Sequence, residues 1–596
     1  MSVANSSRSR ASNATIDDSV FSMVVALDIG TSWSGYAYGY RRELEENMDN
    51  VIVNNQWSFG TKSSTATFKT PSHLLLNEKR EFEAYGYEAE RRYSELCQQG
   101  RHQRCFFFRR FKARLNTAQQ GVSASQTLKD EHGKSISALK VFAISIRFLK
   151  GHLLNALRMR GKEISTEDIK WMITVPAMWN DTSKQFIRQA AVQAGIPPEK
   201  LKLALEAEVA SVYCQHMKGV GKLPIHLSGA SYVLADIGGG VTDVVFHQKR
   251  QDGRLKEMNR GGGCTVGSGH IDNAFLQFLT RLLGAPAVRE FIDECKLELL
   301  ELLREFEAAK RFITVSQTNP IKILIPVGLE RICRKIHKGE TMSSLVNKSP
   351  YREKIKVADN KLVIEPSLCY DLFRSACAEI ARAIKKVLSD KYSKHCTVLI
   401  LVGGMAGSNV VQEIIKNELE GKTNIQRIIV PPEPELVILK GAVMFGHNPK
   451  SIFQRVMRFT YGLRKAKLFN PDMHPEDKMV TLHGMEFMTD MFSPFITAGS
   501  RAPVGFMSYD SLTSIEPFQK VIEIDVYYST ELNPSQVTDN NVWLLGKIEY
   551  QIPNPSKEER TIYIEFIFGD TELIINITDR KTASRFKNTF PEIDKS

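Results

Sequence analysis

The sequence has few cysteines for its length, and none of them forms a C-x-x-C pair. Nine cysteines are scattered over 596 residues, and their number is odd. A zinc site built from cysteine pairs and a disulfide framework both lack support, because each needs cysteines at a characteristic spacing. A reducing, intracellular compartment fits this usage better than a secretory one.

Long apolar runs are also lacking. No run reaches the roughly 18 apolar residues that a membrane-spanning helix needs. Residues 1–20 are rich in Ser, Asn and Arg, which predicts a disordered tail rather than a signal peptide. We therefore expect a protein of the cytoplasm or the nucleus without a transmembrane segment.

Charge of one sign is only mildly in excess. The chain carries 79 Lys and Arg against 67 Asp and Glu, for a formal net charge of +12. Because these residues are spread along the chain, we expect a solvated surface and no nucleic-acid partner. A weak contact with acidic lipid is left open.

A Walker A loop is missing, because the G-K-[ST] triplets at Gly133 and Gly421 lack the glycine upstream. Instead, an apolar strand runs into an Asp-x-Gly turn twice, in "VVALDIGTSWSGYAYGY" (24–40) and "VLADIGGGVTDVVFHQ" (233–248). Glycine turns expose N–H groups that bind phosphate. A buried aspartate beside them is costly unless it holds a hydrated divalent cation. The pair predicts one Mg-nucleotide gripped from two sides; two ordinary hairpins are the alternative.

The order of elements predicts two α/β lobes and a third, β-rich domain. Residues 21–225 and 226–450 each open with the Asp-x-Gly turn, which is a weak internal repeat. In the first, a strand at 171–175 precedes a helix capped by Asn180 or Asp181. From residue 451 to 596 apolar and polar residues alternate, and Gly569-Asp570 forms a hairpin turn. This part predicts a β-sandwich-like domain.

Five segments, in their order along the chain, resemble a known family. They are "LDIGTSWSG", "ITVPAMWND" with "LEAEVASVY", "ADIGGGVTDVV", "LILVGGMAGS" and "LKGAVMFG". Together they resemble the actin-like ATPase (ribonuclease H-like) fold of the 70-kDa heat-shock proteins, and are most similar to the divergent heat shock 70 kDa protein 12 subfamily. The resemblance implies a two-lobed nucleotide-binding domain for ATP or ADP with Mg²⁺, followed by a substrate-binding-like β domain.

The resemblance also implies roles for individual residues. Asp28 and Asp236 would hold the water shell of Mg²⁺, Asp236 and Glu206 would serve catalysis, and Lys112 would reach the γ-phosphate, with Arg110 as its rival. The residues implied at the phosphates are Gly30, Thr31, Ser32, Trp33, Gly238, Gly239, Gly240 and Thr242. Those implied at the ribose and adenine are Glu307, Lys310, Arg311, Gly403, Gly404 and Met405.

Two of these stretches also have a purely structural interpretation. The segment around Lys112, "RCFFFRRFKARL", fits a helix with an apolar face of Phe107, Phe108 and Phe111. The segment "EAAKRFIT" around Lys310 fits a solvated amphipathic helix. The sequence leaves both choices open.

Several positions depart from the family pattern. Val241 stands where ordinary members have a threonine, and Ser268 replaces a glycine. The segment 450–463 is basic where the family has an acidic, leucine-rich linker, and no helical lid is expected before residue 596. These departures keep three functions open: a slow ATP-hydrolysing chaperone or regulator acting on client polypeptides, a non-hydrolysing nucleotide-dependent adaptor, and a small-molecule kinase.

Overall fold

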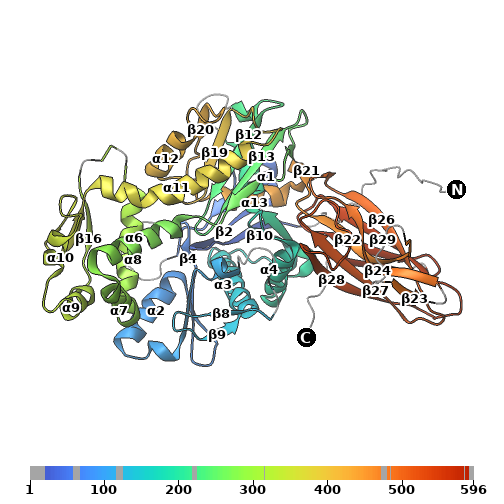
Figure 1. Ribbon diagram of the computed structural model, residues 1–596, viewed down its shortest axis with the longest axis horizontal. Helices are drawn as coiled ribbons and strands as arrows, with labels where there is room; N and C mark the ends of the chain where they lie inside the picture. Colours follow the sequence, from blue (N-terminus) through green and yellow to red (C-terminus); the bar gives the residue numbers. More distant parts are fainter. Residues whose placement is uncertain are drawn as a thin grey trace.

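The computed structural model describes residues 21–57, 67–115, 122, 125–217, 224–314, 316–317, 319–471, 479–482, 485–582 and 584–589. The predicted tail at 1–20 lies outside these ranges. Two central sheets with their helices form one body, and a β-rich domain extends from it to one end of the molecule (Figure 1).

The first sheet is built around the first Asp-x-Gly strand. Its order is β11 (Leu201–Leu205), β10 (Ile169–Val175), β1 (Met23–Ile29), β2 (Trp33–Tyr40) and β3 (Ile52–Val53). β1 is antiparallel to β2 and parallel to β10, and β10 is parallel to β11. Every residue of β1 is buried, because helices cover both faces of such a sheet and its strands are continuously apolar.

The second sheet repeats this topology. Its order begins β20 (Arg427–Ile429), β19 (Val398–Val402), β12 (Ser231–Ile237), β13 (Thr242–Lys249) and β14 (Leu255–Glu257). β12 is antiparallel to β13 and parallel to β19, which is parallel to β20. The internal repeat read from the two Asp-x-Gly turns is therefore present in the backbone.

Helices connect and cover these sheets. On the first sheet they are α3 (Ala138–Met159), α4 (Asp181–Gln193), α5 (Glu206–His216) and α13 (Val437–His447). On the second they include α6 (Ser268–Leu283), α11 (Pro366–Leu388) and α12 (Asn409–Leu419), and α8 (Lys296–Phe312) packs beside α6. α4 begins as predicted, because the Asn180 side chain accepts a hydrogen bond of 3.0 Å from the Ser183 N–H.

Smaller elements extend each half. Beside the first sheet lie α2 (Gly86–Gln98) and the strands β5 (His73–Leu76), β6 (Phe82–Tyr85) and β7 (Phe106–Arg109). The second half adds α7 (Ala285–Glu294), α9 (Val327–Ile336) and α10 (Met342–Lys348). It also holds the three-stranded sheet of β16 (Ile321–Leu324), β18 (Lys361–Ile364) and β17 (Ile355–Ala358).

The helix considered for "RCFFFRRFKARL" is wrong. Phe106–Arg109 form β7, and Phe111–Leu115 form a short 3-10 helix. Phe107 and Phe108 point to opposite sides of the strand and enter two different apolar clusters. Three consecutive phenylalanines are compatible with either period, and pairing of β7 with β5 selects the strand.

The C-terminal domain consists of two packed sheets. One has the order β23 (Met479–Leu482), β24 (Met485–Ile496), β22 (Thr460–Leu468), β27 (Val521–Ser529) and β28 (Val542–Gln551). The other has the order β26 (Phe506–Thr513), β29 (Thr561–Phe568), β30 (Ile574–Asp579) and β31 (Ser584–Thr589). A shared apolar core lies between them, and Gly569, at φ +82°, turns the chain between β29 and β30. Among the described residues after Ser451 there is no helix.

Candidate functional site

The two Asp-x-Gly turns lie against each other. A Cβ atom on Gly239 would come within 2.6 Å of Ser32 Oγ, and one on Gly240 within 2.8 Å of Thr31 Oγ1. Both turns are closed in the same way, by a hydrogen bond of 3.0 Å from Gly30 N to Trp33 O and from Gly238 N to Val241 O. The structure thus brings together the predicted phosphate-facing residues of both sheets.

The Gly403-Gly404 turn encloses the aspartate of the second sheet. Gly403 has φ +91°, and a Cβ there would lie 2.5 Å from Asp236 Oδ1. Met405 is buried, and its N–H donates to Ile237 O at 3.3 Å. Gly404 faces open space. Thr242 is turned away from the two turns, since its hydroxyl donates to Val266 O at 2.8 Å.

Asp28 is neutralised by partners that lie far from it in the sequence. Lys69 Nζ lies 2.7 Å from Asp28 Oδ2, and the Thr174 hydroxyl donates to Oδ1 at 2.8 Å. Burial alone would raise the pKa of Asp28, but Lys69 and Lys112 outweigh it and lower that pKa. The sequence analysis missed both residues: Lys69 stands in no recognisable motif, and Thr174 lies in the segment "ITVPAMWND" without any sign that its hydroxyl meets Asp28.

Lys112 and Arg110, the two candidates for the γ-phosphate contact, have different partners in the structure. Lys112 Nζ lies 2.7 Å from Glu206 Oε1, and both side chains are buried. Burial lowers the pKa of Lys112, but Glu206 and Asp28 outweigh it, so the ammonium keeps its proton. Arg110 instead forms an ion pair with Asp272 of α6. Lys112 thus joins Lys69 among the carboxylates of the site.

Asp236 has no ion pair of this kind among the described residues, although the charge of Lys69 acts to lower its pKa. Its Oδ1 atom is buried and has no hydrogen-bond partner among the described residues. Burial, together with the charges of Glu206, Asp243 and Asp28, raises the pKa of Asp236 well above its ordinary value. Asp243, opposite Asp236 in the β12–β13 register, was also missed; it accepts a hydrogen bond of 2.8 Å from Ala177 N.

This concentration of carboxylates fits a bound cation. A buried aspartate without a partner is unstable unless something positive satisfies it. No three His, Cys, Asp or Glu side chains in the described part of the chain stand where they could bind one metal ion together. The arrangement therefore fits an ion that keeps most of its water and phosphate ligands, as Mg²⁺ does, with Asp28 and Asp236 contacting the waters.

The residues implied at the ribose and adenine are only partly brought to the turns. The Arg311 guanidinium lies over the Trp33 ring, 5.0 Å from its centroid, so it joins α8 to the first turn. Lys310 Nζ is held by Asp272 at 2.6 Å and by Glu307 at 2.5 Å. The buried pair of Lys310 and Asp272 thus joins α8 to α6, with Glu307 at its edge.

A family model described as "Hsp70 protein" matches residues 116–447, more than half of the chain. The chain therefore belongs to the Hsp70 family, whose members bind ATP or ADP with Mg²⁺. It is 29% identical to human "Heat shock 70 kDa protein 12A" over 95% of its own length and 91% of that protein's. It is also 29% identical to human "Heat shock 70 kDa protein 12B", over 94% of this chain and 90% of that protein.

More distant members match a smaller part of the chain. Rice "Heat shock 70 kDa protein BIP3" is 23% identical over 53% of this chain and 42% of its own. The broad similarity to the 12A and 12B proteins confirms the resemblance drawn from the five segments. An actin-like ATPase fold accords with the mixed α/β structure and the family match.

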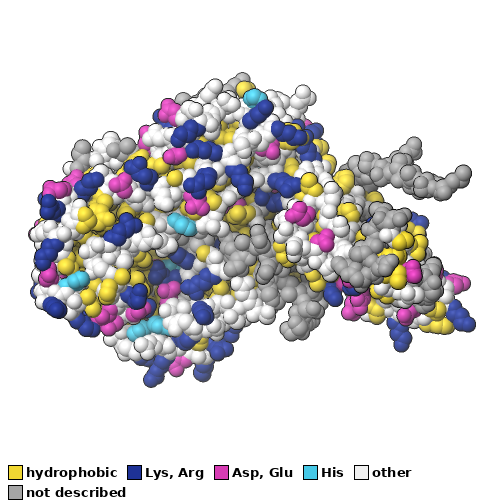
Figure 2. Space-filling model, in the orientation of Figure 1, with side chains coloured by type: hydrophobic (Ala, Val, Ile, Leu, Met, Phe, Trp, Pro, Cys, Tyr) yellow, Lys and Arg dark blue, Asp and Glu magenta, His cyan; other side chains and the backbone are white. Residues whose placement is uncertain are grey.

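The surface and the helices carry two further observations. On the face in Figure 2, Lys and Arg side chains are dispersed among Asp and Glu rather than gathered into one patch.

Within the described residues, no helix combines the length and the apolar character that crossing a membrane requires.

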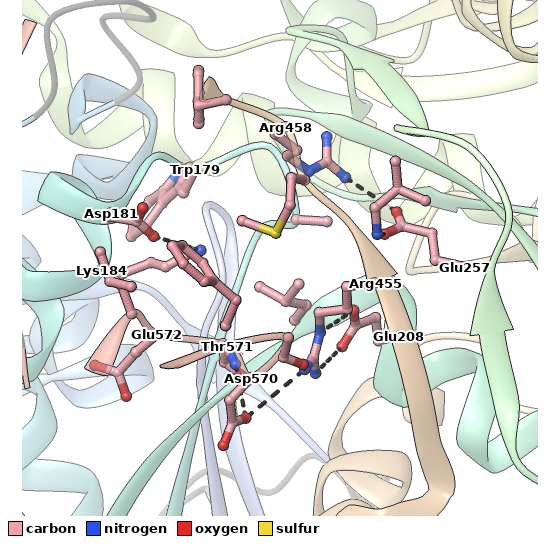
Figure 3. Close-up of a pocket in the computed structure, with 18 of the residues that line it drawn as sticks. Trp179, Asp181, Lys184, Glu208, Glu257, Arg455, Arg458, Asp570, Thr571 and Glu572 are labelled. Carbon is pink, nitrogen blue, oxygen red and sulfur yellow. Dashed lines mark hydrogen bonds and ion pairs between the residues drawn. The ribbon is translucent and has the colours of Figure 1, made fainter. Parts of the chain in front are cut away.

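A second polar centre joins the sheets to the C-terminal domain. The strand β21 (Ile452–Val456) lies parallel to β14, and β25 (Arg501–Pro503) pairs with its other side. Arg455 forms two hydrogen bonds of 2.7 Å with Glu208 at the start of α5 and also donates to Gly569 O. The Val456 N–H donates to Glu257 Oε2 at 2.8 Å. These groups surround a cavity of about 70 Å³ (Figure 3).

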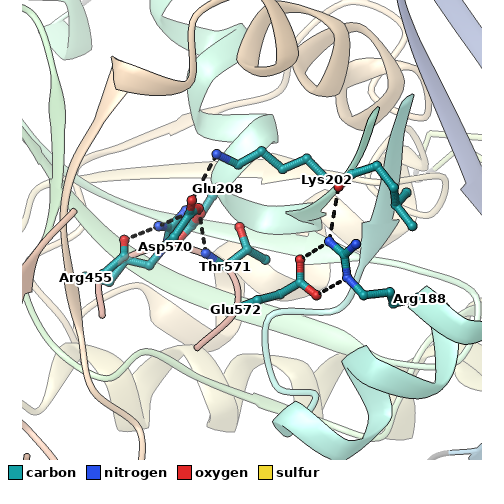
Figure 4. A network of polar contacts seen from close by, with 9 residues as sticks. Arg188, Lys202, Glu208, Arg455, Asp570, Thr571 and Glu572 are labelled. Carbon is teal, nitrogen blue, oxygen red and sulfur yellow. Dashed lines mark hydrogen bonds and ion pairs between the residues drawn. The ribbon is translucent and has the colours of Figure 1, made fainter. Parts of the chain in front are cut away.

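The β29–β30 turn completes this centre. Asp570 lies 3.0 Å from Lys202 of β11, and Glu572 binds Arg188 of α4 through hydrogen bonds of 2.6 and 2.5 Å (Figure 4). Burial would raise the pKa of Asp570, but Lys202 and Arg455 outweigh it and lower it to about 2. The sequence identified Gly569-Asp570 only as a hairpin turn; the acids of the turn are also docking groups.

Proposed function

We propose that this chain binds Mg-ATP between its two sheets, hydrolyses it slowly, and couples the nucleotide to the docking of its C-terminal domain. The observation that carries the proposal is the buried, unpartnered Asp236 carboxylate beside two glycine turns in mutual contact. In this assignment 21–225 and 226–450 are the two lobes of the clamp, and 451–596 is the client-binding domain.

Each residue would act through its position. Gly239 and Gly240 would donate their N–H groups to the phosphates, while the N–H of Gly238 closes the turn on Val241 O, and Lys112 would neutralise charge as the terminal phosphate leaves. Glu206, already bonded to Lys112, would orient the attacking water. Asp28 and Asp236 would hold the water shell of Mg²⁺, which would supply positive charge against the phosphates.

Coupling to the C-terminal domain is supported by continuous contacts. Asp243 holds the backbone of Ala177 beside the site. Three residues further on, the Asn180 amide donates to Tyr528 OH in the C-terminal domain at 3.3 Å, and the Tyr461 hydroxyl donates to Asp181 Oδ2. A nucleotide that moves the loop at 176–180 would therefore change the position in which the C-terminal domain docks, as in a protein with two conformational states.

A second function, a non-hydrolysing nucleotide-dependent adaptor, is favoured by one observation. Val241 replaces the usual threonine, and the neighbouring Thr242 hydroxyl is engaged with Val266 O rather than facing the turns. No hydroxyl from this position would then reach the terminal phosphate. Nucleotide would serve as a structural ligand, and partner binding would be the output. Chaperone action and a role in stress belong to the first proposal.

The deciding experiment is single-turnover hydrolysis of ATP by the purified chain beside Asp236→Asn. The substitution keeps the size of the side chain and removes its charge. Hydrolysis by the wild type that disappears in the variant supports the clamp with turnover. Bound but intact ATP supports the adaptor. Absence of nucleotide binding overturns both.

A further inference from the structure

A groove on the first half of the molecule lies apart from the turns and from the docked β domain. One wall is a single stripe of α3, which runs through Lys140, Ile144, Arg147 and His152. The other wall comes from residues 80–82, where the chain enters β6. The cavity between them measures about 720 Å³, which lies in the range of specific binding pockets.

The floor of this groove is aromatic. Phe148 stacks between Tyr85, at a centroid distance of 4.8 Å, and Phe82, at 5.7 Å. Further along α3, His152 stacks on Trp57 at 4.8 Å. Phe82 nevertheless remains 45% exposed. Phe82, at the end of this stack, is supported by Phe148 on one ring face and can offer the other face to an apolar group of a partner.

The rim of the groove is basic. Arg80, Lys140 and Arg147 line it together with one carboxylate, Glu81. Arg147 is held in place because it donates to Gln193 O at 2.6 Å. A cationic rim around an aromatic floor is complementary to a ligand that combines negative charge with a bulky apolar side chain.

We propose that this groove docks an acidic peptide segment of a partner protein, with one bulky apolar side chain of the peptide against Phe82. The length of the groove favours a peptide. From Lys140 to Asn155 the stripe spans about 22 Å at the rise of an α-helix, which equals roughly seven extended residues. A segment of that length would be long enough to run past Lys140 and Arg147, with Arg80 on the facing wall.

The groove is linked to the first Asp-x-Gly turn by a chain of hydroxyl groups. Tyr85 OH is 2.9 Å from Ser34 Oγ, which is 2.7 Å from Ser72 Oγ, and the Ser72 hydroxyl donates to Gly30 O at 2.7 Å. Because the Tyr85 ring stacks on Phe148, a docked peptide that moves these rings would also move the hydroxyl groups that lead to Gly30. This consequence rests on the proposed nucleotide function, whereas peptide docking itself does not.

The test is selection of a random displayed peptide library on the full chain without nucleotide. We expect enrichment of acidic peptides with an aromatic or large aliphatic residue. In fluorescence anisotropy, an enriched peptide should bind the double variant Phe82→Ala, Arg147→Glu about tenfold or more weakly. Arg158→Glu, on the same helix beyond the groove, should bind as the wild type does, and circular dichroism should show all variants folded.

Three results would overturn the docking proposal: no enriched peptide, enriched peptides that are not acidic, or equal affinity for the wild type and the double variant. Binding of the wild type to phosphatidylserine vesicles, lost in the double variant and without peptide enrichment, would assign the groove to acidic lipid instead. Because the assay contains no nucleotide, it gives its answer even where ATP binding fails.

Discussion

Glu206 and Glu208 stand two positions apart in the first turn of α5, on different sides of that helix, and bind different cations. Glu206 holds Lys112 at 2.7 Å beside the glycine turns. Glu208 holds Arg455, in the strand that leads into the C-terminal domain, through two bonds of 2.7 Å. One helical turn therefore connects the candidate nucleotide site to the docked domain.

The Glu208–Arg455 pair predicts a large effect of removing one partner. Glu208→Gln leaves the Arg455 guanidinium buried without its main counter-charge. We expect the docked state to lose about 3 kcal/mol, the lower end for a broken buried pair, since Asp570 remains 3.8 Å away. Hydrogen exchange should show this loss as faster exchange of the backbone amides of β21.

The matched control for that pair is the double variant Glu208→Gln, Arg455→Met. It removes both charges and should recover most of the lost protection. A double variant that opens as readily as Glu208→Gln would show that the ion pair is not what holds β21.

We expect the Asp236 carboxylate to lower the stability of the ligand-free chain and to be needed for binding Mg-ATP. Since burial raises its pKa, its ionised form destabilises the ligand-free fold as the pH rises through that pKa. Asp236→Asn should therefore raise the thermal midpoint of the ligand-free chain at pH 8 by a few degrees. The same variant should lose the stabilisation that Mg-ATP gives the wild type. A ligand-free midpoint that falls would contradict this account of Asp236.

Glu257 predicts that docking depends on pH. Burial raises its pKa to about 7, and the nearby Glu208 adds to this effect, while Arg458 and Arg455 act against it. The docked state thus binds a proton that the undocked state releases. Docking should be strongest below the ordinary Glu pKa and weaken as the pH rises through 7, by at most about 1.4 kcal/mol per pH unit.

Small-angle scattering at pH 6 and pH 8 measures this shift as a change in the radius of gyration. Glu257→Gln should make the two values equal, because it removes the titrating group. His247, opposite Glu257 in the β13–β14 register, stays neutral in this range since burial lowers its pKa to about 4. Equal radii in the wild type would contradict the prediction.

Gly267 allows a steric test of whether the second glycine turn binds phosphate. A Cβ there would lie 2.4 Å from Gly238 O and 2.8 Å from Gly240 N, both backbone atoms. Gly267→Ala should displace this turn, cost about 1–3 kcal/mol of stability and weaken ATP binding in calorimetry. Gly151→Ala is the control, because a Cβ on that α3 glycine meets no atom within 4 Å. Unchanged ATP affinity in Gly267→Ala would mean that this turn does not bind phosphate.

Much of the fold was predictable because its signals are local. An apolar strand, an aspartate and glycines in sequence specify a buried strand that turns sharply, and the second copy predicts the second sheet. The cap at Asn180 was predictable for the same reason. The Phe106–Phe108 run was not, because its local pattern fits two periods and a distant strand decides between them.

The sequence by itself determined the two Asp-x-Gly turns, their order along the chain, and the alternation that makes the C-terminal domain β-rich, because backbone conformation and side-chain period are properties of neighbouring residues. Only the tertiary structure decided which charges meet. Lys69 meets Asp28, Arg455 meets Glu208 and Glu572 meets Arg188 across 41, 247 and 384 positions. Such pairs form because burial requires a partner for each charge, and a linear pattern does not show which distant residue will be that partner.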